Sequence, residues 1–325
     1  MKTTRSKVRF LCLILVLAAV CAAFAGCSSG KTESGKPSVV VTVFPIYDWV
    51  RQIAGDRVDI TLLLDRGVDL HSYQPTADDV VRISTADMFI FVGGESDAWV
   101  DDIIAGAKNG DLIPLDLIEE LGDRAKEEEI KEGMQAEEEE DDEEEGPEYD
   151  EHIWLSLKNA SVLCGVIAEK LCAIDPDGAD AYGGAAADYV SKLDELDKEY
   201  EKAVGDAKIK TVLFGDRFPF RYLVDDYGLD YYAAYTGCSA ESEASFETVT
   251  FLAAKVDELS LPAILQIETA SGQLAETVRA ATETKDQKIL TLDSLQSSVK
   301  EDVENGKSYL DTMKKNLEVL KEALG

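Results

Sequence analysis

The chain has 325 residues, of which 32 are Lys or Arg and 65 are Asp or Glu, so its formal net charge at pH 7 is −33. This acidity excludes nucleic acid as a partner, because a phosphate backbone would be repelled. Hydrophobic residues make up 45% of the sequence, which is typical of a globular protein, and the length suits two domains of the usual ~100–200 residues. The only continuously apolar segment is 10–26, which excludes a polytopic membrane protein.

Residues 1–26 have the features of a secretory signal peptide. A positively charged start precedes an apolar stretch, which ends in the small pair Ala25-Gly26 before Cys27. This ending resembles the lipobox of bacterial lipoproteins, in which Cys27 becomes the lipidated first residue; an ordinary cleaved signal is the alternative. Residues 27–37 would then form a flexible tether. We therefore expect an extracytoplasmic lipoprotein, anchored to the membrane at the bacterial cell surface or in the periplasm.

Short apolar runs alternate with amphipathic segments along the rest of the chain, as in βαβ units. We predict an α/β fold of two (β/α) lobes with mostly parallel sheets, residues 38–183 and 208–325, joined by a long backbone helix at 184–207. Ligands of such sheets bind beyond the carboxyl ends of the strands, so a site should lie in the cleft between the lobes. The predicted strands are residues 39–44, 59–64, 88–92, 211–214, 231–234, 263–267 and 288–292.

An acidic segment interrupts the first lobe at residues 119–151. Nine consecutive acids occupy positions 137–145 within it. Because like charges repel each other and bury no apolar surface, we predict that the whole insertion is disordered and solvated. It could be a solubilising insertion or a weak collector of divalent cations, and the sequence favours neither role.

Cysteines contribute little to the functional prediction. Besides Cys27, the mature chain would contain Cys164, Cys172 and Cys238, and no C-x-x-C pair is available for zinc or redox chemistry. Cys164 and Cys172 lie eight positions apart in a helical segment, about 12 Å at 1.5 Å per residue, which is too far for a disulfide between them. The disulfide state of the three residues is otherwise open.

The two histidines of the chain, His71 and His152, both fall in predicted loops. Acids follow or end the strands of the second lobe, where they could also be helix N-caps. Two imidazoles and several carboxylates at converging strand ends can supply the four N or O ligands that a first-row divalent ion requires. The acids concerned are Asp216, Glu268 and Asp293.

Three motifs, in order along the chain, resemble those of the substrate-binding lipoproteins of zinc and manganese ABC importers. His71-Ser72-Tyr73-Gln74-Pro75 is similar to that family's His-x-[Tyr/Phe]-[Glu/Gln]-Pro loop, and residues 91–95 with Trp99, then residues 150–155, continue its order. The resemblance extends from about Val39 to the C-terminus. It implies a monomeric binding protein, not an enzyme, that holds Zn²⁺ or Mn²⁺ between its lobes and delivers the ion to an ABC transporter membrane permease.

The resemblance also implies a ligand set. His71 and His152 fall on the first two metal ligands of the family, and Asp293 falls on its aspartate of the second lobe. The third ligand is Asp216 when counted from the start of the preceding strand, whereas counting back from Tyr227-Gly228-Leu229 gives Arg217, which cannot bind a cation. We therefore expect a site of His71, His152, Asp216 and Asp293, with Glu243 and Glu268 as substitutes for the third ligand.

Three other classes of function are compatible with such residues. A binding protein for a chelated metal or cobalamin could share the helix-joined architecture, but it would not need a histidine directly before Ile153-Trp154-Leu155. A secreted metallohydrolase would leave an open metal position for water, but the H-E-x-x-H, G-x-S-x-G and G-x-x-x-x-G-K-[ST] motifs are absent from the sequence. A surface adhesin would keep its metal as a structural element. Reversible metal binding without turnover would distinguish transport from the enzyme.

Overall fold

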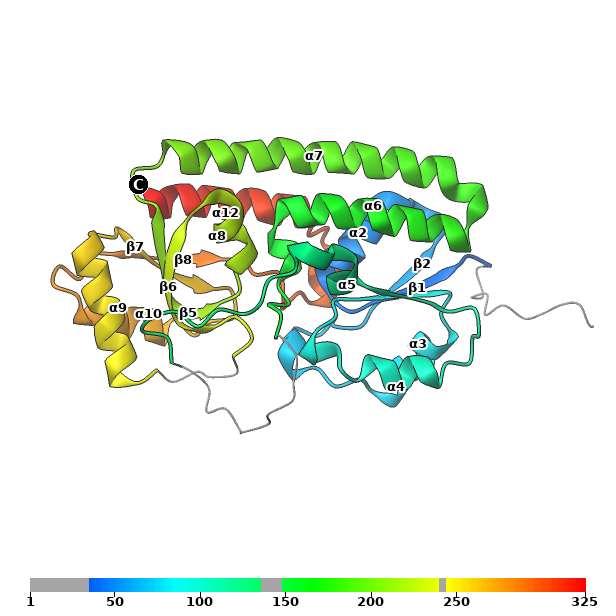
Figure 1. The fold of residues 1–325 in the computed structure, drawn as a ribbon, viewed down its shortest axis with the longest axis horizontal. Helices are drawn as coiled ribbons and strands as arrows, with labels where there is room; N and C mark the ends of the chain where they lie inside the picture. The colour runs from blue at the N-terminus through cyan, green and yellow to red at the C-terminus, as the bar shows by residue number, and fades with distance from the viewer. Residues whose placement is uncertain (1–34, 136–147, 240–243) are drawn as a thin grey trace, which may run out of the picture.

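The computed structural model describes residues 35–135, 148–239 and 244–325. It contains two α/β lobes, side by side beneath a long helix (Figure 1). Every strand pair in the two described sheets is parallel, so the predicted fold class is confirmed. The N-lobe sheet has the order β2-β1-β3-β4, with β1 Ser38–Val41, β2 Asp59–Leu62, β3 Met88–Phe91 and β4 Ile113–Asp116. The C-lobe sheet has the order β6-β5-β7-β8, with β5 Thr211–Phe218, β6 Asp230–Thr236, β7 Ala263–Ile267 and β8 Lys288–Leu292.

All seven predicted strands are present, although β2 is shorter than predicted and β5 and β6 are longer. Proline accounts for two further differences. The run predicted as residues 39–44 ends as a strand at Val41, because Phe44 begins helix α2 and Pro45 occupies its first turn, where a missing N–H costs nothing. Strand β4 was not predicted. It has only four residues and includes Pro114, which is tolerated here because β4 lies at an edge of the sheet.

Helices lie between the strands, and many begin at a side-chain cap. Thr76 and Asp79 form a reciprocal capping box at the start of α3, and Ser308 accepts a hydrogen bond at the start of α12. The helices are α2 Phe44–Ala54, α3 Ala77–Thr85, α4 Val100–Ala105, α5 Leu117–Leu121, α6 Leu157–Ile174, α7 Ala179–Asp206, α8 Arg221–Tyr227, α9 Phe246–Leu259, α10 Gln273–Ala281, α11 Lys300–Glu304 and α12 Tyr309–Leu324. None of the helices in the described ranges is long and apolar enough to cross a membrane.

Helix α7 is the predicted backbone helix, and it starts five residues earlier than predicted, at Ala179. Its buried residues recur at helical spacing, from Tyr182 through Tyr189 and Leu196 to Val204. It contacts α2 and α6 of the N lobe and α8 and α12 of the C lobe, and therefore spans both lobes (Figure 1).

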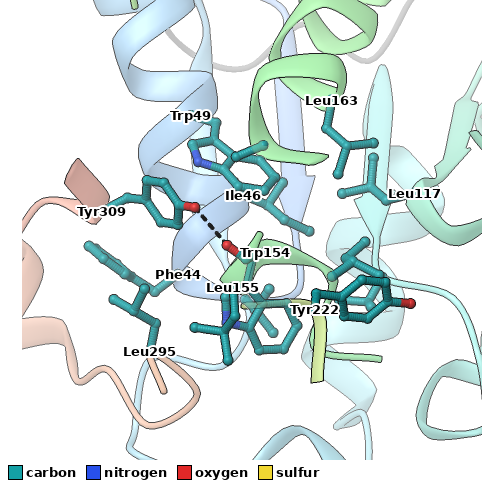
Figure 2. Close-up of a cluster of buried hydrophobic side chains, with 14 of the residues drawn as sticks. Phe44, Ile46, Trp49, Leu117, Trp154, Leu155, Leu163, Tyr222, Leu295 and Tyr309 are labelled. Carbon is teal, nitrogen blue, oxygen red and sulfur yellow. Dashed lines mark hydrogen bonds between the residues drawn. The ribbon is translucent and has the colours of Figure 1, made fainter. Parts of the chain in front are cut away.

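The two lobes share one continuous hydrophobic core. Figure 2 shows its centre, where Trp49 and Trp154 lie close to Tyr222 and Tyr309. The Tyr309 hydroxyl donates a 2.6 Å hydrogen bond to the Trp154 carbonyl, and the Trp49 and Tyr309 rings meet edge to face at 5.3 Å. Since these residues come from both lobes, the shared core fixes one lobe relative to the other, and with it the loops at the cleft.

The acidic insertion differs from its prediction. Residues 119–135 and 148–151 contain the end of α5 and a short 3-10 turn and contact the C lobe, so the predicted disorder is wrong for them. Lys131 forms an ion pair with Asp230, Arg221 forms one with Glu129, and Gln135 N donates to the Ala234 carbonyl. These contacts hold the segment against the C lobe, and the Arg221 pair also neutralises one of its acids. The acidic run at 137–145 lies outside the described residues, as do residues 1–34 with Cys27.

Candidate metal centre

His71 lies in a short 3-10 turn, Leu70–Ser72, at the edge of the N lobe that faces the C lobe. Asp69 caps this turn and accepts a 3.1 Å hydrogen bond from His71 N. The Nδ1 atom of His71 lies 2.9 Å from Ser96 Oγ and 3.3 Å from Glu151 Oε2. With Nδ1 occupied in this way, Nε2 is the atom that faces the centre of the site.

His152 directly precedes a second 3-10 turn, Ile153–Leu155, and is fully buried. One oxygen of Asp150 accepts from His152 N at 2.8 Å and lies 2.9 Å from His152 Nδ1. The ring also meets Trp154 edge to face, at 5.4 Å. A carboxylate on the far nitrogen of an imidazole is the usual support of a metal-binding histidine, because it fixes the orientation of the ring and its tautomer.

The two Nε2 atoms of His71 and His152 are 3.2 Å apart. Two nitrogens on one tetrahedral zinc ion, each at ~2.0–2.1 Å from the metal, are about 3.3 Å apart. The imidazole pair therefore already has the spacing that a single ion needs.

Glu151 directly precedes His152 in the chain, and its side chain lies against His71. It accepts from Ser96 N at 2.8 Å, and Gly94, at φ 85°, leaves room for it, because a Cβ there would lie 2.6 Å from Glu151 Oε1. Burial raises the pKa of Glu151, but the hydrogen bond and charge of His71 outweigh it, so the pKa is lowered overall. Burial likewise lowers the pKa of His71, but the hydrogen bond and charge of Glu151, with the charge of Asp69, raise it above its ordinary value.

Cys238 is the third potential ligand, and it was not predicted from the sequence because a single cysteine forms neither a disulfide nor a C-x-x-C pair. Its Sγ and a nitrogen of each of His71 and His152 lie within 4.8 Å of one another. Cys238 directly follows Gly237 at the carboxyl end of β6, the position that could have identified it. Burial raises the pKa of the Cys238 thiol, and the charges of nearby acids, Asp150 first, raise it further.

The structure does not bring Asp216 to the imidazole pair. A register irregularity in β5 places its carboxylate against backbone groups, where it accepts from Ile267 N at 2.9 Å and from Arg217 N at 2.8 Å. Its neighbour Arg217 extends to the rim of the site instead. One guanidinium nitrogen lies 2.7 Å from Asp69 Oδ2, and another donates to the Ser239 carbonyl at 3.2 Å.

Asp293 is also engaged elsewhere. Its carboxylate accepts from Leu295 N at 2.8 Å and lies 3.1 Å from Lys307 Nζ. Glu268, proposed as a substitute, accepts from Ser294 N and Ser294 Oγ at 2.7 and 2.8 Å. Glu243, the other substitute, lies outside the described residues. The ligand roles of Asp216 and Asp293 stay predictions, with contacts that do not favour them.

Gln296 is the residue through which the loop after β8 reaches the site. With its amide nitrogen facing Asp69, at 3.2 Å from both carboxylate oxygens, its amide oxygen lies 2.7 Å from His152 Nε2. This buried amide therefore contacts both the cap of the His71 turn and the inward nitrogen of His152. Gln296 was not predicted from the sequence either, because its side chain is neither charged nor an imidazole.

This chain is similar to known proteins over most of its length. Residues 39–323 match the family described as zinc-uptake complex component A, periplasmic. The zinc-binding lipoprotein AdcA of Streptococcus pneumoniae strain R6 is 33% identical over 311 residues, which are 95% of this chain and 60% of AdcA. The chain thus spans little more than half the length of that relative. The high-affinity zinc uptake system protein ZnuA of Bacillus subtilis is 29% identical over 316 residues, covering 96% of this chain and 95% of ZnuA.

Solved structures of metal-binding proteins are also similar to this chain. The Zn(II)-bound ZnuA-like domain of Streptococcus pneumoniae AdcA has a TM-score of 0.70 and 29% identity, covering 89% of this chain and 99% of that domain. The metal-dependent lipoprotein YcdH of Bacillus subtilis has a TM-score of 0.71 and 28% identity, with the same coverage of both chains.

Proposed function

The chain belongs to the zinc-uptake complex component A family, and on that premise we propose that it is an extracytoplasmic binding protein that captures one zinc ion and delivers it to the permease of an ABC importer. The observation that carries the proposal is the pair of Nε2 atoms, 3.2 Å apart, of His71 and His152. Each ring is supported on its other nitrogen by an acid, Glu151 or Asp150. This arrangement leaves the inward nitrogens for a cation.

The site is suited to binding and release and does not require a reaction. Its inward groups are potential ligands at the cleft between two lobes that share a core, and their partners are acids that orient the rings. Zinc is proposed as the cargo because both sequence relatives are named for zinc, and manganese is the second candidate. Anchoring through a lipid on Cys27 and a monomeric state complete the proposal. No observation within the described residues favours an adhesin or a hydrolase.

The test is a zinc titration of the purified full chain against a competing chelator, with elemental analysis for stoichiometry. We expect one tightly bound zinc ion per chain, and loss of tight binding in His71→Ala. Asp101→Ala is the matched control, because Asp101 is an exposed acid on α4. If zinc binds the unmodified chain only at several weak sites, the acidic insertion is the binder and the proposal is wrong.

A further inference from the structure

We propose that Cys238 binds the ion as a thiolate, which completes a site of two imidazole nitrogens and one sulfur and makes the protein select zinc over manganese. This inference rests on the proposed function and names the donor set of the same site. It departs from the expected ligands, in which the C lobe contributes only carboxylates. Within the described ranges, the group of potential ligands around the imidazole pair contains Cys238 and no carboxylate of the C lobe.

The first support is the close approach of the Cys238 loop to His152. Gly237 lies so near the imidazole that a Cβ would be 2.9 Å from His152 Cε1 and 3.0 Å from the Phe218 carbonyl. Any larger residue at 237 would move the loop away from the ring. Glycine at this position is therefore what lets the end of β6 bring the Cys238 sulfur within 4.8 Å of one nitrogen of each imidazole.

The second support is that neighbouring residues hold this loop on both sides of the sulfur. Cys238 N donates a 3.1 Å hydrogen bond to Glu128 Oε1, which belongs to the acidic insertion of the N lobe. The next residue, Ser239, accepts a 3.2 Å hydrogen bond at its carbonyl from Arg217. Arg217 is in turn paired with Asp69, beside His71. The backbone on both sides of the sulfur is thus hydrogen-bonded to the acidic insertion, which precedes His152, and to Arg217, which pairs with Asp69 beside His71.

The third support is that the other candidates for the third ligand are unsuited to binding a metal. Asp216 already accepts two backbone hydrogen bonds, and moving its carboxylate to the site would leave buried N–H groups without acceptors. Arg217, at the other counted position, has a permanent positive charge and cannot bind a cation. The Cys238 thiol is not consumed by a disulfide, since Cys164, Cys172 and Cys238 are all free.

A sulfur ligand has consequences for the choice of metal. Thiolate binds zinc well, at ~2.3 Å, whereas manganese prefers carboxylate, carbonyl and water oxygens. Replacing an expected oxygen donor with Cys238 therefore adds preference for zinc to the advantage that zinc already has at mixed nitrogen and oxygen sites. The three protein ligands leave one tetrahedral position, which a water molecule or another oxygen donor can occupy.

Cobalt(II) tests the inference directly, because it occupies zinc sites and a thiolate ligand gives it a near-ultraviolet charge-transfer band. We expect the full chain to develop this band with one equivalent of cobalt and to lose it when zinc is added. Cys238→Ser should lose the band, while the controls Cys172→Ser and Cys27→Ser keep it. A stoichiometric cobalt complex of the unmodified chain without the band would overturn the inference and leave the proposed function intact.

Affinity measurements supply the second arm. Cys238→Ser should weaken zinc binding at least ~10-fold, since loss of a ligand costs no less than loss of its supporting residue, and should weaken manganese binding less. Thermal unfolding of the metal-free variant checks that it folds. Equal loss of affinity for both ions would overturn the claim of selectivity. If the unmodified chain binds neither cobalt nor zinc with one-to-one stoichiometry, the proposed function fails instead.

Discussion

The N-lobe loops and the C-lobe strand ends carry similar polar residues at the same cleft, but use them differently. In the N lobe, acids support the outer nitrogens of His71 and His152, and the inner nitrogens face each other. In the C lobe, Asp216 and Asp293 accept backbone hydrogen bonds with their own carboxylates. Position at a strand end therefore does not by itself leave a side chain free to bind a metal.

The physical reason lies in how many atoms of each side chain remain available for a metal once its hydrogen bonds within the protein are made. An imidazole has two separate nitrogens, so one can be anchored while the other binds a metal. A carboxylate that already accepts two backbone N–H groups is part of the local structure, and removing it costs buried hydrogen bonds. This contrast predicts which substitutions affect zinc affinity and which affect folding.

The largest effect is expected from His152→Ala, which removes a fully buried residue of the proposed ligand set. We expect zinc affinity to fall ~100-fold or more, because loss of a supporting residue alone costs ~10–100-fold. Competition with a chelator of known affinity measures the change. A fall of less than about tenfold would show that His152 is not a ligand. It would also contradict the proposed difference between the lobes, in which only the N lobe uses its histidines to bind the metal.

Glu151→Gln should have the next largest effect. The substitution keeps the shape of the side chain but removes the negative charge 3.3 Å from His71 Nδ1. Zinc affinity should fall by ~10–100-fold, because the ring is less basic and less firmly oriented. Glu119→Gln, at an exposed position of α5, is the matched control in the same titration. Equal affinities of the two variants would show that Glu151 does not support the metal.

The pH dependence should have opposite signs for zinc affinity and for folding. The raised pKa of His71 means that its contribution to the stability of the metal-free protein is complete below ~6.5 and is lost as pH rises through the folded value. Zinc needs the neutral ring, so its affinity should fall as pH drops through that value, by about tenfold per pH unit for each displaced proton. Titrations and thermal unfolding between about pH 5 and 8 measure both trends. An affinity that is flat across this range would contradict histidine ligation.

Asp216→Ala should leave zinc affinity almost unchanged and reduce stability. Its carboxylate accepts hydrogen bonds from two backbone N–H groups, and leaving such groups unsatisfied costs about 1–3 kcal/mol. Denaturant unfolding of the metal-free variant gives the stability, and chelator competition gives the affinity. A loss of affinity comparable to that of His152→Ala would restore Asp216 as a ligand.

The smallest effect on zinc affinity at the His71–His152 site should follow deletion of residues 137–145. The histidines and Cys238 belong to described parts of both lobes, so the affinity should change less than about threefold. A longer deletion that includes Glu128 is the informative comparison, because Glu128 accepts the hydrogen bond from Cys238 N. Loss of tight binding in the short deletion would mean that the acidic run itself supplies a ligand.

Much of the fold could be predicted from the sequence, because it depends on local patterns. Apolar runs fixed β7 and β8 at the predicted residues, and helical spacing located α7 to within five residues at its start. The motif around His71 and that around His152 identified two of the inward groups of the site. Each of these signals lies within a few turns of chain, where side-chain period and residue type decide the structure.

The tertiary structure alone decided which other groups reach the imidazole pair. Arg217 and Asp69 are 148 positions apart and form an ion pair, and Cys238 lies 110 positions from its partner Glu128. No local pattern encodes such contacts, because they depend on how the lobes pack through their shared core. The same packing orders residues 119–135, whose composition alone predicted disorder, since Arg221 of the C lobe pairs with Glu129 and Lys131 of the insertion pairs with Asp230 of the C lobe.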